Sequence, residues 1–165
     1  MVLAALLLGC GDEDNNSPVP AGGTVEGNYT VSLTNRDNGC QFEDWTQGDS
    51  TSGIRLQLTE EEGDVTGEVT GQGSALVLTL VLGAGGNVLE GTASGGRIEL
   101  TRLGTTSFLD GDCTYTLNAT LAADINGDII QGSIRYTAAT NDNPDCTGLE
   151  GCISRQDFNG TRPPT

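Results

Sequence analysis

Short segments in which apolar side chains alternate with polar ones constrain the fold of this chain more than any other feature. The clearest of them lie at residues 29–33, 54–58 and 115–121. Successive side chains of a β-strand point to opposite faces, so each segment predicts a strand with one apolar and one polar face. Gly is abundant between these segments, and the Gly spacing would break a helix. We therefore expect an all-β domain.

The expected strands are joined sequentially by tight turns. Asn126-Gly127 is the strongest turn signal, because a type I′ hairpin needs positive φ at both central residues. Sequential hairpins favour an antiparallel up-and-down β-barrel of about 8–10 strands, and a β-sandwich is the alternative. The ranges are 28–34, 54–59, 65–69, 76–82 (the most apolar), 87–94, 97–103, 114–121, 130–136 and 153–159, with a further short strand at 41–47.

The expected β domain contains four cysteines, Cys40, Cys113, Cys146 and Cys152. In an exported domain such a set predicts two disulfides, whereas a zinc site would need C-x₂-C spacings that are absent. Barrel closure would set the last strand beside the first and pair Cys40 with Cys152 and Cys113 with Cys146. Sequence proximity instead pairs Cys146 with Cys152 and leaves Cys40 with Cys113. We favour this second pairing.

A short apolar run, Val2–Leu8, ends in Leu7-Leu8-Gly9-Cys10, which resembles the lipobox of bacterial lipoproteins. The run is too short to span a bilayer, which needs about 20 residues. The resemblance implies cleavage before Cys10 and lipidation of that Cys, which would hold the protein on a membrane. No Lys or Arg precedes the run, so we expect the natural start to lie upstream and residues 1–9 to be a signal-peptide remnant.

The segment after Cys10 is acidic and lacks apolar periodicity. Residues 11–23 read GDEDNNSPVPAGG, a composition typical of a flexible tether. We therefore divide the chain into residues 10–23, the lipidated Cys and its tether, and residues 24–165, a single barrel-like domain. The lipoprotein resemblance implies a cell-envelope location. It also implies the outer membrane, because many lipoproteins kept in the inner membrane carry Asp where this chain has Gly11.

Charge and composition exclude several classes of function. The chain has 23 acidic residues, seven Arg, neither Lys nor His, and a net charge of −16. Such a surface repels nucleic acid, which we do not expect as a partner. The absence of His excludes catalysis by Ser-His-Asp or Cys-His groups, and the absence of Lys excludes Schiff-base catalysis. We therefore do not expect this protein to be an enzyme. We expect it to associate with a membrane only through the N-terminal lipid.

Two acidic motifs have simpler structural interpretations. Residues 124–128 echo a calcium loop, but Ile129 and Arg135 stand where that loop needs Gly and Glu, so a hairpin turn explains them better. Glu43 and Asp44 flank Trp45, yet neighbouring strand residues point to opposite faces and would not converge on one bond. We expect Trp45 to cover one barrel end. No cofactor is expected, and calcium is the one metal that such oxygen ligands would suit.

Gly27-Asn28-Tyr29 on the first strand resembles the Gly-x-Trp motif of lipocalin-like barrels, with Tyr in place of Trp. Arg155 or Arg162 would correspond to the Arg that these barrels carry near their end. The resemblance extends to broad layout only and assigns no ligand.

Two functions remain open. About twenty interior side chains, many of them Leu and Ile, would fill a barrel of this size, so we favour a packed envelope lipoprotein with a structural or surface-interaction role. The alternative is a binding module that holds a small apolar ligand in the lumen.

Overall fold

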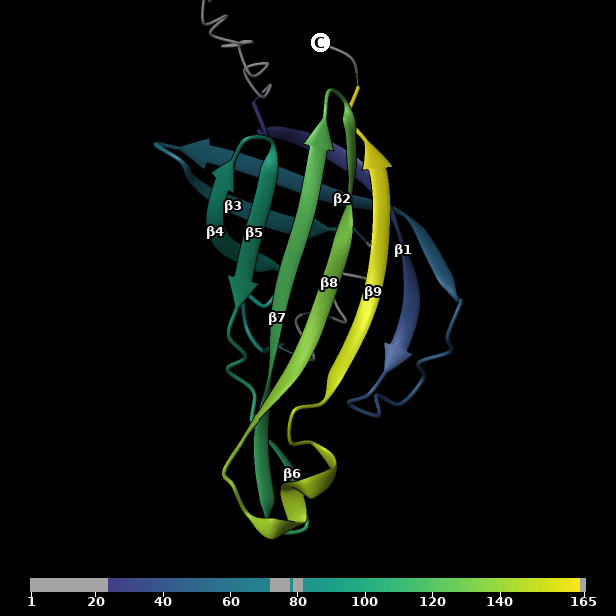
Figure 1. Cartoon of the computed structure of the whole chain (residues 1–165), viewed down its shortest axis with the longest axis vertical. Helices are drawn as coiled ribbons and strands as arrows, with labels where there is room; N and C mark the ends of the chain where they lie inside the picture. The colour runs from purple at the N-terminus through teal and green to yellow at the C-terminus, as the bar shows by residue number, and fades with distance from the viewer. Residues whose placement is uncertain (1–23, 72–77, 79–81, 164–165) are drawn as a thin grey trace, which may run out of the picture.

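The computed structural model describes residues 24–71, 78 and 82–163 and consists almost entirely of antiparallel strands (Figure 1). One short 3-10 helix, η1, spans Pro144–Gly148. The strands are β1 (Gly27–Asn38), β2 (Ser50–Glu61), β3 (Asp64–Thr70), β4 (Val88–Ser94), β5 (Arg97–Arg102), β6 (Phe108–Asp110), β7 (Cys113–Asn126), β8 (Ile129–Thr140) and β9 (Ile153–Thr161). Among the described residues, no helix is long and apolar enough to cross a bilayer.

Eight of these strands close into a barrel. The hydrogen-bonded order is β5-β4-β3-β2-β1-β9-β8-β7-β6, and a further pairing of β5 with β7 closes the ring. Every pairing is antiparallel, and without β6 the strands follow one another around the ring in sequence order, with β9 returning to β1. The expected up-and-down barrel is confirmed, and the β-sandwich alternative is wrong. Strand β6 stays outside the ring, and within the described residues it pairs only with β7.

The apolar series of the sequence face the barrel interior. On β1, Tyr29, Val31 and Leu33 are buried, and the residues between them are more exposed. Strand β7 repeats the pattern at alternate positions from Leu117 to Ala123. Interior positions on neighbouring strands therefore share one core. The apolar side chains whose alternation predicted the strands form this core. The largest fully buried apolar side chains include Tyr29, Leu56, Leu58, Leu82, Leu89, Ile98, Leu100, Leu121 and Ile130.

Two-residue turns connect the two strands of several hairpins. Gly95 and Gly96 both have positive φ, at 59° and 82°, as a type I′ turn requires. In the hairpin between β7 and β8, Asn126 pairs with Ile129, so the turn residues are Gly127 and Asp128. The expected hairpin is present, but its turn begins one residue later than Asn126-Gly127. Only Gly127 has positive φ there, which is typical of a type II′ turn.

Two expected strands are corrected. Strand β3 pairs directly with β4, so the apolar segment at 76–82 is not a barrel strand between them. Most of that segment lies outside the described residues, and Leu78 and Leu82, which are described, are helical and buried. Residues 41–47 form turns and loop instead of a strand, and β1 extends to Asn38 in their place.

Candidate functional site

Both disulfides lie at one end of the barrel, here called the disulfide pole, which comprises residues 39–49, β6 and η1. Cys40 is bonded to Cys152, and Cys113 is bonded to Cys146. The expectation of two disulfides is confirmed, but the pairing favoured on sequence proximity is wrong. The structure has the pairing that barrel closure produces.

Barrel closure explains the first disulfide. Because β1 pairs with β9, the end of β1 arrives beside the start of β9. The Gly39 amide donates to the Ile153 carbonyl over 3.0 Å, and the Cys40 amide donates to Ser154 Oγ over 3.0 Å. A side chain at Gly39 would place its Cβ 2.5 Å from the Ile153 carbonyl oxygen, so this close approach requires glycine.

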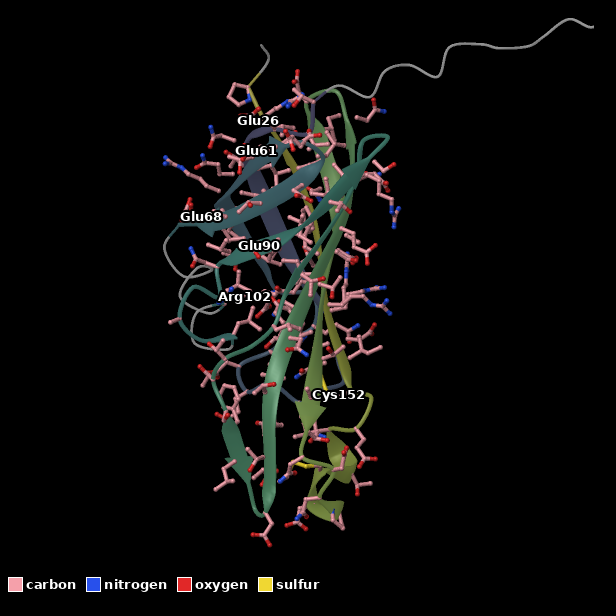
Figure 2. The ribbon with its side chains drawn as sticks, turned by 90° about the vertical axis from the view of Figure 1, so that its left-hand side faces the viewer. Glu26, Glu61, Glu68, Glu90, Arg102 and Cys152 are labelled. Atoms are coloured by element: carbon pink, nitrogen blue, oxygen red, sulfur yellow. A yellow bond between two sulfur atoms is a disulfide. The ribbon has the colours of Figure 1, made fainter. Side chains whose placement is uncertain are left out.

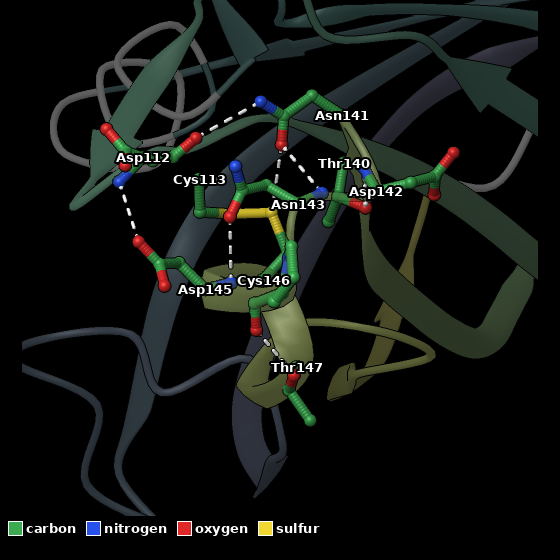
Figure 3. The surroundings of a disulfide bond; sticks show 10 residues. Asp112, Cys113, Thr140, Asn141, Asp142, Asn143, Asp145, Cys146 and Thr147 are labelled. Atoms are coloured by element: carbon green, nitrogen blue, oxygen red, sulfur yellow. Dashed lines mark hydrogen bonds between the residues drawn. A yellow bond between two sulfur atoms is a disulfide. The ribbon is translucent and has the colours of Figure 1, made fainter.

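Turn chemistry positions the second disulfide (Figure 3). The Asn143 side chain accepts a hydrogen bond from the Asp145 amide and caps η1, which turns Cys146 into the interior. Asp145 Oδ2 accepts from the Asp112 amide over 3.0 Å, and Asn141 Nδ2 donates to the Asp112 carbonyl. The acidic and amide residues of 141–145 therefore act as turn and capping groups that hold η1 against the start of β7.

An aromatic cluster covers the interior at the disulfide pole. Phe42 and Trp45 come from the loop at 39–49 and meet the edge of Tyr136, with ring centroids 5.6 Å and 6.2 Å away. Trp45 Nε1 donates to the Arg36 carbonyl, which fixes the indole. Glu43 and Asp44 point into solvent from this loop. Trp45 thus covers a barrel end as expected, and the two carboxylates form no converging pair.

Below the aromatic cluster, buried Tyr136 begins a series of hydrogen-bonded polar side chains whose other members, Gln156 and Asn35, are half-buried. The Tyr136 hydroxyl donates to Gln156 Oε1 over 2.9 Å, and Gln156 Nε2 donates to Asn35 Oδ1 over 2.7 Å. Burial raises the pKa of the Tyr136 hydroxyl far above its ordinary value, so it stays a hydrogen-bond donor at any physiological pH. Because Tyr136, Gln156 and Asn35 are hydrogen-bonded to one another, we interpret this series as part of the packing of the barrel end.

The opposite end of the barrel, the terminal pole, is closed by Arg162. Its guanidinium lies over the Tyr29 ring, with Cζ 5.5 Å from the centroid, and its side chain is 11% exposed. It pairs with Asp128 through Nε and donates to the carbonyls of Thr24, Glu26 and Gly127. One side chain therefore joins the start of the domain, the β7–β8 turn and the end of β9. Of the two Arg considered from the sequence, Arg162 contacts Tyr29, whereas Arg155 pairs with Asp157.

Replacing Arg162 with Lys should lower the free energy of unfolding by about 2 kcal/mol, because an ammonium group cannot serve these spread acceptors or stack on Tyr29 as a planar guanidinium does. Urea unfolding followed by Trp45 fluorescence measures the loss. Arg97→Lys is the matched control, since the Arg97–Asp124 pair is 63% exposed on both sides and should change stability by well under 1 kcal/mol. Equal effects of the two substitutions would contradict the role of Arg162.

The barrel interior leaves little free space among the described residues. A cavity of about 10 Å³ lies within it, which is about the room for one water molecule. Small-molecule sites typically measure about 300–1,000 Å³. The lining is wholly apolar: Val31, Leu33, Ile54, Leu56, Val69, Leu78, Leu121, Ile134 and Phe158.

The remaining candidate residues are placed as follows. Cys10, with the signal segment and the tether, lies outside the described residues. In the part of the chain that the structure describes, no group of three or more Asp, Glu or Cys side chains is placed to hold a metal ion.

The outer surface of β2, β3 and β4 exposes Glu61, Glu68 and Glu90 (Figure 2). Sequence reasoning missed β6, because three residues are too few to display an alternating pattern.

Compared with protein-family models, with curated proteins and with solved structures, the chain matches none of them. The class of protein that the fold defines is an eight-stranded up-and-down β-barrel with one added strand.

Proposed function

We propose that this protein is an envelope lipoprotein, anchored by a lipidated Cys10, whose packed barrel acts through its outer surface. The observation that carries the proposal is the small size of the apolar cavity between the described barrel strands, since about 10 Å³ has no room for a small apolar ligand. The two disulfides support an exported location, because such bonds persist in oxidising compartments.

The placement of the domain's start supports a tethered arrangement. Thr24 lies at the terminal pole, where Arg162 holds its carbonyl, so residues 11–23 would leave the barrel from that end. A flexible chain of this length has a root-mean-square span of about 20 Å. The tether would then hold the barrel close to the membrane and would join it at the end opposite the disulfide pole. The Arg162–Tyr29 contact also supports the resemblance to lipocalin-like barrels, which we propose for the layout alone.

Cys10→Ala should move the protein from the membrane fraction to the soluble fraction and abolish incorporation of a fatty-acid analogue, because the acyl acceptor is gone. Fractionation and labelling in cells measure both effects. Gly11→Ser is the matched control, since it leaves Cys10 and the residues before it intact. Membrane association that persists in Cys10→Ala would overturn the anchor.

The soluble Cys10→Ala protein also distinguishes the packed barrel from the ligand-carrying alternative. Its native mass spectrum should show the bare polypeptide mass. A lipid that co-purifies in stoichiometric amount would support the carrier and contradict the packed, surface-acting barrel, whatever the outcome for the anchor.

A further inference from the structure

Strand β6 is an open sheet edge at the disulfide pole. β5 pairs with β7 up to the Arg102–Ala119 pair, and β6 pairs with the part of β7 from Cys113 to Tyr115. In the strand order β6 stands at the end, so its second edge has no strand beside it among the described residues. Figure 1 places β6 at the end of the molecule opposite the C-terminus. Such an edge is a template for a further strand.

The hairpin register shows which backbone groups face that edge. Asp110 pairs with Cys113 across the two-residue turn Gly111-Asp112, and Leu109 pairs with Thr114. The pair that flanks a two-residue turn is hydrogen-bonded, and the next pair is not. The N–H and C=O of Leu109 therefore point away from β7, toward the open edge.

Leu109 is an exposed apolar side chain on this edge, and a second exposed leucine precedes the strand in the sequence. Leu109 is 74% exposed, and Leu103, in the segment that leads from β5 to β6, is 66% exposed. Behind them Phe108 stacks on Tyr115, with ring centroids 5.4 Å apart, which supports β6 from the interior side. An exposed leucine whose backbone groups point away from the sheet is the combination that strand addition uses: hydrogen bonds for affinity and side chains for selectivity.

The charge around the edge is negative. Asp110, Asp112 and Asp145 are exposed within the same turn region, where the Asp145 carboxylate meets the Asp112 amide. Burial raises the pKa of the Tyr115 hydroxyl, and the neighbouring carboxylates of Asp110 and Glu43 raise it further. With a net charge of −16, a second copy of this chain would be repelled, whereas a basic segment would be attracted.

We propose that β6 is a docking edge for an extended, basic segment of a partner protein, which pairs with Leu109 as an added strand. Lys or Arg side chains of the segment meet the carboxylates of Asp110 and Glu43, and an apolar side chain of the segment packs on Leu109. The proposal deepens the surface-acting role proposed above and rests on it. It names the surface and the chemistry of the partner.

The test uses a labelled peptide of alternating Lys and Val residues and the full lipidated chain in non-ionic detergent, with binding measured by fluorescence anisotropy. Leu109→Pro should weaken binding at least tenfold. Proline removes the N–H that faces the partner and leaves the β6–β7 hydrogen bonds in place, because that N–H makes none of them. Thermal unfolding verifies that the variant is folded. Ile153→Ala, at an exposed apolar side chain on β9, is the matched control and should bind as the natural protein does.

Two further peptides test the chemistry. A Glu–Val peptide should bind at least tenfold more weakly than the Lys–Val peptide, and N-methylation of the valines should abolish binding because it removes backbone donors. The proposal is overturned if the Lys–Val peptide does not bind at millimolar concentration, if Leu109→Pro leaves its affinity unchanged, or if the Glu–Val peptide binds equally.

Sedimentation of the protein without peptide tests the competing occupant. A dimer that Leu109→Pro dissociates would assign the edge to a second copy and overturn the proposal. These outcomes are separate from the fate of the proposed function, which depends on the native mass of the soluble protein and on membrane fractionation of Cys10→Ala.

Discussion

Replacing Cys40 and Cys152 with Ala should lower the free energy of unfolding by about 5 kcal/mol, the largest loss expected from removing a single covalent link in this chain. The two residues are separated by 112 positions, so the bond removes much chain entropy from the unfolded state. Cys113 and Cys146 are separated by 33 positions, and their removal should cost about 4 kcal/mol. Chemical unfolding of the two double variants, followed by Trp45 fluorescence, measures both values.

Peptide mapping without reduction provides the control for this prediction. A digest of the natural protein should contain one cross-linked peptide with Cys40 and Cys152 and another with Cys113 and Cys146. A peptide that links Cys146 to Cys152 would contradict the observed pairing. If the pair that closes the shorter loop proved the more stabilising, native-state strain would outweigh chain entropy.

Leu100→Ala should lower the free energy of unfolding by about 3–5 kcal/mol, because it leaves a cavity in the packed interior. Leu100 is fully buried on β5, and its Cδ1 lies 2.6 Å from the position that a Cβ at Gly67 would occupy. Leu100 therefore fills the space that the missing side chain of Gly67 provides on β3. Urea unfolding measures the loss, and Ile129→Ala, at a residue 55% exposed, is the control, with little expected change.

A double-mutant cycle tests whether the two positions are coupled. Gly67→Ala alone should cost about 1–3 kcal/mol through overpacking against Leu100. In the Leu100→Ala background the same substitution should cost little or even stabilise, because the added methyl enters the new cavity. Additive losses would show that the two positions pack independently.

Local patterning predicted most of the barrel. The alternation at Tyr29, Val31 and Leu33 identified β1 because one face of that strand is buried, and the same reasoning found β2, β3, β4, β5, β7, β8 and β9. It failed at Leu78 and Leu82, which are helical and buried, because a short apolar run also suits a buried helical segment.

Features that depend on tertiary contacts were harder to predict. Sequence distance favoured joining Cys146 to Cys152, but η1 turns Cys146 toward Cys113, and the β1–β9 pairing brings Cys152 to Cys40. Strand β6 had no signal of its own, because its pairing with β7 begins where β5 ends. The proposed docking edge could be recognised only after the register placed the backbone of Leu109 outward.

The ring of strand pairings has one further consequence. Because β9 lies beside β1 and Arg162 binds the carbonyls of Thr24 and Glu26, the first and last described strands meet at the terminal pole. A short linker there, with the chain opened at the exposed Gly95-Gly96 turn, would give a circular permutant that keeps all the pairings around the ring. The same barrel is therefore compatible with sequences whose strands follow a rotated order, and the pairings between neighbours define this fold better than the order of its strands along the chain.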